Sequence, residues 1–192
     1  MSRNTFLVQM SGAPGAGKTT IASELVRRYR MVSIDHDVVK SAVLDGGHEF
    51  DGAGRVSYHV ILAVVDDMLA QGHSVVIDSP CLYQNLLTEG MSIAARRAAR
   101  YLYVECLVDD IELLNSRLLA RTPLRSQRAS VHTPPQDLGS DHDPAGAELF
   151  RTWIDGMKRP DTGYLRLDTT QALNVCVAEL VEFLSTDGVA HG

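Results

Sequence analysis

"GAPGAGKT", residues 12–19, fits the pattern G-x-x-x-x-G-K-[ST] at every fixed position. Glycines let successive backbone N–H groups point inward, and a helix that starts after such a loop adds its positive end. The apolar run TFLVQMS (5–11) before the loop is typical of a buried strand, and TTIASELVRRY (19–29) after it reads as a helix. A glycine-rich turn without a ligand is the alternative, but this order of strand, loop and helix favours a site for nucleotide phosphates.

The parts of the loop have separate expected roles. Lys18 is expected to reach the β- and γ-phosphates, and the Thr19 hydroxyl is expected to bind Mg²⁺. ATP is the expected phosphoryl donor because no N-K-x-D-like guanine motif occurs, although GTP stays open. The nucleotide contacts predicted in the loop are Gly12, Ala13, Pro14, Gly15, Ala16, Gly17, Lys18, Thr19 and Thr20.

Length and composition narrow the class of protein. The chain has 192 residues, which favours one domain over 1–192, and 45% hydrophobic residues, which are typical of a globular protein. A formal net charge of −6 gives no general reason to bind nucleic acid or an anionic membrane. Three scattered cysteines, with no signal peptide or membrane span in the pattern, predict a reduced, cytoplasmic protein. The sequence does not indicate an oligomeric state.

Strand-like runs alternate with helical patterns along the chain. Apolar residues recur at helical spacing around 61–69 and again around 173–184, and Asp109 or Asp110 is placed to cap the helix that follows. Alternating strands and helices predict an α/β fold, a three-layer α/β/α sandwich with a five-stranded parallel sheet. The expected strands are 5–11, 31–35, 73–78, 101–108 and 163–168.

A long polar stretch interrupts this alternation. Residues 122–146 are rich in Pro, Ser, Asp and Gly and have no periodicity. Connections of this length in a compact domain are usually functional lids or mobile loops. Arg117, Arg121 and Arg125 recur at intervals of four residues into this stretch, and Arg128 follows three residues later. We therefore expect a lid at about 117–147 that brings Arg117, Arg121 and Arg125 over the phosphates. An exposed charged face is the alternative.

Carboxylates follow two of the expected strands. Asp35 and Asp37 follow MVSI, and Asp78 ends VVID in VVIDSP (75–80). The carboxyl ends of parallel strands meet at one edge of a sheet, so these acids should face the phosphates. Asp35 and Asp78 are predicted to bind Mg²⁺ with Thr19, and each aspartate could instead cap a helix or close a turn. Ser79, Pro80 and Tyr83 would then border an acceptor pocket.

Residues 35–40, DHDVVK, resemble the D-G-D-x-x-R segment of adenylylsulfate kinases. They are more loosely similar to the matching region of gluconate kinases, chloramphenicol phosphotransferase and polynucleotide-kinase-like proteins. His36 replaces the usual glycine and Lys40 the usual arginine. The resemblance implies the kinase-like fold of the P-loop NTPases, with Asp37 as catalytic base and Asp35 near the metal. It also implies that residues 167–174 pass beside the nucleotide base.

Together these patterns predict a phosphotransferase that moves the γ-phosphoryl group of ATP to a hydroxyl of a small molecule, possible acceptors being an antibiotic or other natural product. A sugar acid, a nucleoside or a nucleotide sugar would suit the same chemistry. A nucleotide-dependent regulatory ATPase or switch is the alternative from another class. The expected catalytic residues are Lys18, Asp35, Asp37 and Arg121, with Mg²⁺ as cofactor and neither nucleic acid nor membrane as partner.

Overall fold

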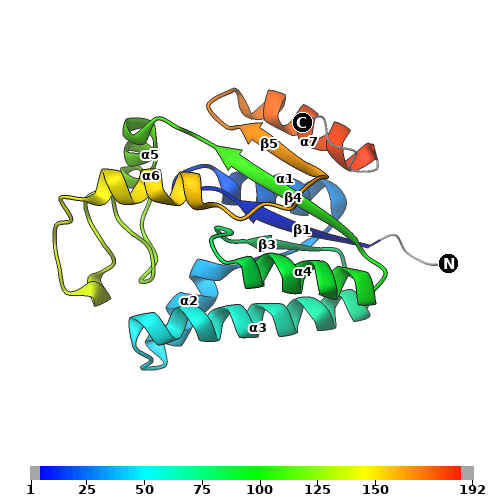
Figure 1. The fold of residues 1–192 in the computed structure, drawn as a ribbon, viewed down its shortest axis with the longest axis horizontal. Coiled ribbons are helices and arrows are strands. Elements are labelled where there is room, and N and C mark those ends of the chain that lie inside the picture. The colour runs from blue at the N-terminus through cyan, green and yellow to red at the C-terminus, as the bar shows by residue number, and fades with distance from the viewer. Residues whose placement is uncertain (1–4, 187–192) are drawn as a thin grey trace.

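The computed structural model describes residues 5–186. In it, one five-stranded sheet lies between two layers of helices (Figure 1). The strands are β1 (Phe6–Ser11), β2 (Val32–Asp35), β3 (Val75–Asp78), β4 (Arg100–Leu107) and β5 (Tyr164–Asp168). The helices are α1 (Lys18–Tyr29), α2 (His36–Asp45), α3 (Phe50–Ala70), α4 (Gln84–Arg96), α5 (Ile111–Leu119), the 3-10 turn η1 (Gln136–Leu138), α6 (Gly146–Gly156) and α7 (Leu173–Ser185).

The predicted parallel sheet is confirmed. Every neighbouring pair of strands is parallel, and the order across the sheet is β2-β3-β1-β4-β5. The central strand β1 therefore runs directly into residues 12–19, which we call the phosphate loop. The carboxyl ends of the strands point to the left in Figure 1, toward α2, α5 and α6. Ligand sites of such sheets lie at this edge.

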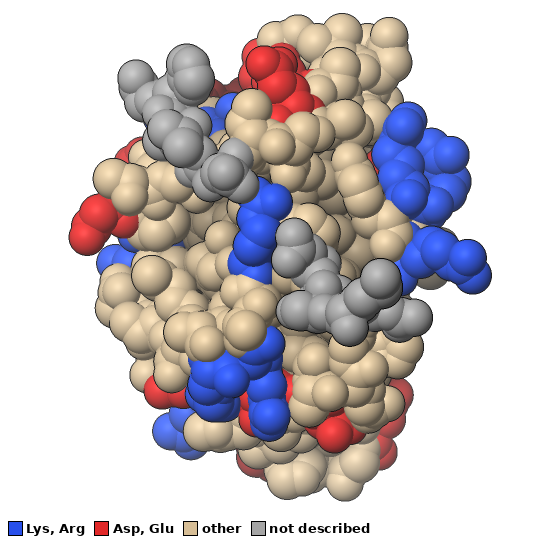
Figure 2. All heavy atoms as spheres, turned by 90° about the vertical axis from the view of Figure 1, so that its right-hand side faces the viewer, with Lys and Arg blue, Asp and Glu red and all other residues tan. Residues whose placement is uncertain are grey.

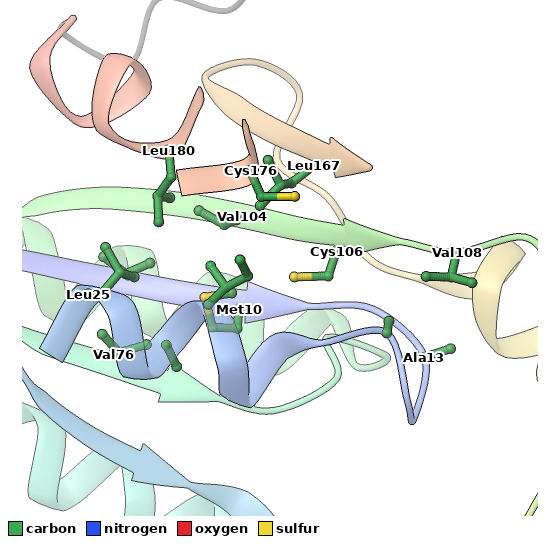
Figure 3. Close-up of a cluster of buried hydrophobic side chains, with 14 of the residues drawn as sticks. Met10, Ala13, Leu25, Val76, Val104, Cys106, Val108, Leu167, Cys176 and Leu180 are labelled. Atoms are coloured by element: carbon green, nitrogen blue, oxygen red, sulfur yellow. The ribbon is translucent and has the colours of Figure 1, made fainter. Parts of the chain in front are cut away.

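Alternation along β1 divides the core between the two faces of the sheet. Val8 and Met10 belong to the cluster with α1, α5 and α7, whereas Leu7 packs with α3 and α4. Cys106 lies in the core, and only 2% of it is exposed. Figure 3 shows it on β4 in the same cluster as Met10 and Cys176. Burying apolar side chains on both faces explains why the strands read as continuous apolar runs.

The segment between α5 and α6 is more ordered than its composition suggests. We call residues 120–145 the lid segment. Arg128 is 7% exposed within it and donates hydrogen bonds to the Val131 carbonyl (2.7 Å) and the Asp143 carboxylate (2.8 Å). Val131 is fully buried, and its N–H donates to the Asn115 side chain of α5 (2.9 Å). Arg128 therefore stabilises the lid segment through hydrogen bonds to other residues of that segment. Its spacing from the other arginines did not predict these contacts.

The amino ends of the strands lie on the opposite side of the molecule. Figure 2 views that side, where Lys and Arg side chains occur in separate groups with acidic and uncharged residues between them. The described atoms visible in this view form no continuous basic surface. None of the helices within residues 5–186 combines the length and the apolar composition that crossing a membrane requires.

Candidate functional site

The phosphate loop has the backbone that its glycines predict. Gly12, Gly15 and Gly17 have positive φ angles of 127°, 86° and 89°. A Cβ atom on Gly12 would lie 2.4 Å from the carbonyl oxygen of Cys106, a distance that side chains do not adopt. Glycine is therefore required where the loop crosses the end of β4, because it combines a left-handed backbone with a close approach.

Lys18 begins α1 and its ammonium group folds back over the loop. Its Nζ donates hydrogen bonds to the carbonyl oxygens of Gly12 (2.9 Å) and Ala13 (3.0 Å). The ammonium is thus held beside the N–H groups of the loop, where an anion would bind. Six of the nine loop residues predicted to contact nucleotide line the adjacent cavity, whereas Gly12, Ala13 and Ala16 lie outside its lining.

A cavity of about 740 Å³ extends from the phosphate loop to the lid segment. Its size falls within the range typical of small-molecule sites. Ser79 and Pro80 line it as expected, while Tyr83 does not and instead packs edge-on against Tyr58. The lining residues that carry polar or charged side chains include Lys18, Thr19, Thr20, Asp35, His36, Asp37, Lys40, Asp78, Ser79, Arg117, Arg121, Ser126, Gln127, Arg128, Thr169 and Gln171.

Asp35 and Asp78 lie opposite each other at the ends of β2 and β3. Asp35 caps α2, because its Oδ1 accepts hydrogen bonds from the N–H groups of Asp37 (2.7 Å) and Val38 (3.4 Å). Burial raises the pKa of Asp35, and the charges of Asp78 and Asp37 raise it further. The helix cap considered as an alternative role is therefore present, and it still leaves the carboxylate in the cavity lining.

Asp78 is a buried acid with an unsatisfied oxygen. It is 3% exposed, and its Oδ2 has no hydrogen-bond partner among residues 5–186. Burial raises the pKa of Asp78, although Lys18 and Thr19 act in the opposite direction. A cation would compensate this charge, and carboxylate and hydroxyl oxygens are ligands that suit Mg²⁺. Thr19, Asp35 and Asp78 thus fit the metal predicted for this edge.

Asp78→Asn is expected to raise the free energy of unfolding of the nucleotide-free protein by about 1 kcal/mol, because it removes a buried charge whose Oδ2 has no hydrogen-bond partner among the described residues. The same change should reduce the extra stabilisation that Mg²⁺ and nucleotide provide. Thermal unfolding with and without Mg²⁺ and AMPPNP measures both effects. A loss of stability in the free protein, with the full stabilisation by Mg²⁺ and nucleotide retained, would show that Asp78 acts as a structural acid only.

Asp37 is held by two residues of the lid segment. Gln127 donates a hydrogen bond to its Oδ2 (2.8 Å), and Ser126 donates to its backbone carbonyl (3.0 Å). The Nδ1 atom of His36 lies 3.6 Å from its Oδ1. Burial opposes ionisation, but His36, Gln127 and Lys18 outweigh it and lower the pKa of Asp37 to about 2. Asp37 is therefore an oriented carboxylate at neutral pH.

Gln127 and Ser126 were not identified from the sequence. They lie about 90 residues after Asp37, in a stretch without periodicity, and no local pattern marks them. Their hydrogen bonds to Asp37 connect the lid segment to the start of α2. The hydrogen bond from Ser126 N to Ser41 Oγ (3.1 Å) reinforces this connection.

The three arginines predicted to contact nucleotide occupy different places. Arg117 supports the phosphate loop, donating to the carbonyl oxygens of Gly15 (3.3 Å) and Thr169 (2.7 Å). Arg121 lines the cavity, and its buried Nε has no partner among the described residues. Burial lowers the pKa of Arg121, while Asp37 and Asp35 raise it.

Arg125 lies away from the cavity, contrary to its predicted position. Its guanidinium forms ion pairs with Asp137 (2.7 Å) and Asp45 (3.0 Å), and it is absent from the cavity lining. The reason is that α5 ends at Leu119, so the i, i+4 spacing no longer places successive arginines on one face. Arg125 instead connects the lid segment to α2.

The segment after β5 borders the cavity opposite α2. Thr169, Gln171 and Leu173 line it, and the Thr169 hydroxyl donates to the Ala16 carbonyl (2.7 Å). Thr169 therefore lies against the phosphate loop. That residues 167–174 pass beside the nucleotide base stays a prediction.

Comparisons with known proteins give one family and a shared fold. A family model described as an AAA domain matches residues 7–134. A candidate kinase of Chloroflexus aurantiacus is 22% identical, with a TM-score of 0.69 over 94% of this chain and 98% of that one. APS kinase of Mycobacterium tuberculosis, solved with AMPPNP and APS, is 16% identical, and the match has a TM-score of 0.63 and covers 95% of this chain and 99% of that one. A gluconokinase of Sinorhizobium meliloti 1021 is 17% identical, and the match has a TM-score of 0.60 and covers 96% of this chain and 94% of that one. No curated protein matches the sequence.

Proposed function

We propose that this chain, which belongs to the AAA domain family and has the fold of P-loop kinases, transfers the γ-phosphoryl group of ATP to a hydroxyl of a small molecule. The observation that carries the proposal is the meeting of three features in one cavity. These are the phosphate loop, a low-pKa carboxylate at Asp37 and the Nε of Arg121, which has no hydrogen-bond partner among residues 5–186. A cavity of about 740 Å³ can hold a nucleotide and a small acceptor together.

Different residues of the cavity would bind the phosphates, hold the metal and stabilise the transferring group. The phosphate loop and Lys18 bind the triphosphate, while Thr19, Asp35 and Asp78 would hold Mg²⁺ or its water ligands. When bound, Mg²⁺ would neutralise charge on the β- and γ-phosphates. Arg121 lines the cavity and would stabilise negative charge on the transferring group, while Arg117 donates to the Gly15 carbonyl and would keep the loop in position.

Asp37 orients the acceptor hydroxyl and accepts its proton. The hydroxyl oxygen forms a bond to the γ-phosphorus, the bond from that phosphorus to the bridging oxygen breaks, and ADP leaves. A carboxylate with a pKa of about 2 is a weak base, so proton transfer belongs late in the reaction. This agrees with the loose transition state of phosphoryl transfer, in which positioning matters more than base strength.

The lid segment gives the carboxylate its position. Gln127 and Ser126 contact Asp37 directly, which supports a kinase in which the same segment that covers the cavity also fixes the base. Exclusion of water is needed because water would otherwise accept the phosphoryl group. A regulatory ATPase would not need a carboxylate oriented in this way.

The acceptor is tested by a screen with γ-labelled ATP and Mg²⁺. Hydroxylated antibiotics and other natural products, sugar acids, nucleosides and nucleotide sugars serve as acceptors, and ³¹P NMR locates the new phosphate ester. We expect transfer to one class at a rate well above ATP hydrolysis without acceptor. Slow hydrolysis that no acceptor accelerates, together with a large conformational change on nucleotide binding, would instead support a regulatory switch.

A further inference from the structure

His36 is a buried side chain of the cavity wall to which the mechanism above gives no role. It is 7% exposed; its Nδ1 lies 3.6 Å from the Asp37 carboxylate, beyond hydrogen-bond distance, and neither ring nitrogen has a hydrogen-bond partner among residues 5–186. Its ring stacks on Tyr58 with centroids 4.2 Å apart and planes 22° apart. Buried polar groups in proteins are almost always satisfied, so an unpaired one in a cavity lining indicates that a ligand completes it.

Lys40 lies one helical turn after His36 on α2 and also lines the cavity. Its Nζ is 3.4 Å from the centroid of the Phe50 ring, and within the described part of the chain it forms neither a hydrogen bond nor an ion pair. Burial lowers the pKa of Lys40, while Asp37, Asp51 and Asp137 act in the opposite direction.

The acids near Lys40 leave its ammonium available to a ligand. Asp137 is paired with Arg125, Asp37 accepts a hydrogen bond from Gln127, and Asp51 is exposed. All three influence Lys40 from beyond ion-pair distance, because none of them forms a salt bridge with it among the described residues. An anion bound in the cavity would therefore meet a partly desolvated cation that lies over the aromatic face of Phe50.

Helical spacing places these groups around the reacting carboxylate. His36, Asp37 and Lys40 occupy positions i, i+1 and i+4 at the start of α2, and all three line the cavity. A hydroxyl held at Asp37 therefore has neighbouring groups of the same molecule within reach of His36 and Lys40. Phe50, Pro135 and Leu138 supply apolar wall beside them.

We propose that His36 and Lys40 form the acceptor subsite and that the acceptor is a hydroxylated anion. A second hydroxyl of the acceptor bonds to the imidazole of His36, and a carboxylate or phosphate ester pairs with Lys40. A hydroxyl fits either tautomer of His36, since it can donate or accept a hydrogen bond. The inference rests on the proposed function, because it takes Asp37 to be the group that binds the reacting hydroxyl.

The binding test uses protein saturated with Mg²⁺ and AMPPNP, so that the nucleotide site is filled. D-gluconate, D-glucose 6-phosphate and the neutral D-glucitol are titrated separately, and the His36 ring signals are followed by NMR. We expect the anionic probes to shift these signals and to bind at least about tenfold more tightly than glucitol, as one charge-assisted contact implies. The first two probes distinguish a carboxylate from a phosphate ester. Equal binding of glucitol, or no shift with either anion, would overturn the proposal.

Two substitutions at Lys40 test the charge itself. Lys40→Met keeps much of the side-chain length and should remove the preference for anionic probes, whereas the matched control Lys40→Arg should retain most of it. If Lys40→Met still prefers the anions, the cation that binds them lies elsewhere and the subsite is wrongly assigned.

His36→Phe separates binding from folding. It keeps the stack on Tyr58 and removes two buried nitrogens that lack hydrogen-bond partners among residues 5–186, losing only the 3.6 Å approach to Asp37, so the thermal stability of the free protein should stay equal or rise. Affinity for the anionic probes should fall, and His36→Gln should recover part of it. Lower stability with unchanged probe affinity would instead assign His36 a structural role.

The two proposals fail in different ways. If anionic probes bind at His36 and Lys40 but no acceptor receives phosphate, the subsite stands and the phosphotransferase proposal fails. If transfer occurs to a neutral acceptor with a kcat/KM that Lys40→Met leaves unchanged, the phosphotransferase proposal stands and the acceptor inference fails.

Discussion

Asp37→Asn is expected to lower the rate of phosphoryl transfer by about 100- to 10,000-fold, the range typical of losing a general base. Asparagine is close to isosteric but cannot take the proton of the acceptor hydroxyl. Nucleotide affinity should be kept or slightly raised, because the substitution removes a negative charge from the cavity that receives the γ-phosphate. Transfer is measured with the acceptor found in the screen, and affinity by calorimetry with Mg²⁺ and AMPPNP.

Asp35→Asn is the matched comparison, because the two acids lie two residues apart at the same sheet edge. Loss of the Asp35 charge should weaken the response to Mg²⁺ more than it affects the acceptor hydroxyl. If Asp37→Asn retains nearly full transfer, the base is elsewhere, and Asp35 and Asp78 are the next candidates.

The low pKa of Asp37 adds a pH dependence to the same variant. Its pKa of about 2 lies below the ordinary aspartate value, so its ionised form favours the folded state. That contribution is fully present above about pH 4 and is lost as the pH falls through about 2. The difference in free energy of unfolding between the wild type and Asp37→Asn should therefore shrink over this interval in urea titrations at several pH values.

The elements that the sequence predicted well are those encoded by neighbouring residues. The phosphate loop follows from glycines at fixed spacing, and the five strands from apolar runs of four to eight residues. Asp110 rather than Asp109 caps α5, accepting hydrogen bonds from the N–H groups of Glu112 and Leu113. A helix cap depends on a few adjacent residues. The sequence therefore predicted a capping aspartate at this point but left open whether it was Asp109 or Asp110.

What could not be predicted depends on contacts between distant segments. Gln127 reaches Asp37 across 90 positions, and Arg159 reaches Glu105 across 54. Glu105 is 1% exposed at the end of β4 and receives two hydrogen bonds of 2.6 Å from Arg159. In the sequence this glutamate only interrupts an apolar strand. Its partner follows α6, and only the fold brings the two together.

The arginines illustrate both cases. Recurrence every four residues predicted one row of arginine side chains along a helix. Helix α5 ends before Arg121, however, so the arginines beyond it have different surroundings. Arg128 and Arg125 pair with aspartates, whereas the buried Nε of Arg121 has no partner in the described residues. Spacing alone cannot decide which cation is left for a ligand, because that depends on where the acids of the lid segment lie.

Lys18→Ala is expected to weaken both nucleotide binding and transfer, each by roughly 100-fold or more, as for the loss of a key charged donor to a phosphate. The free protein should also lose order in the phosphate loop, because the Lys18 ammonium is the donor to the Gly12 and Ala13 carbonyls. Stabilisation by ligand follows the affinity. At a nucleotide concentration 100 times the wild-type Kd, a 100-fold weaker variant should lose most of about 2.7 kcal/mol of ligand stabilisation.

Lys158→Ala is the matched control for Lys18→Ala, because Lys158 is exposed and absent from the cavity lining. It should leave the thermal shift with Mg²⁺ and AMPPNP at the wild-type value. Asp37→Asn gives the opposite comparison: it should bind nucleotide normally and lose phosphoryl transfer, whereas Lys18→Ala should lose both. If Lys18→Ala keeps the wild-type affinity for AMPPNP, the ammonium is not a phosphate ligand. The anion site would then depend on the backbone N–H groups of the loop alone, and the assignment of Arg121 to the transferring phosphoryl group would need to be revised, because the triphosphate would no longer be fixed beside it.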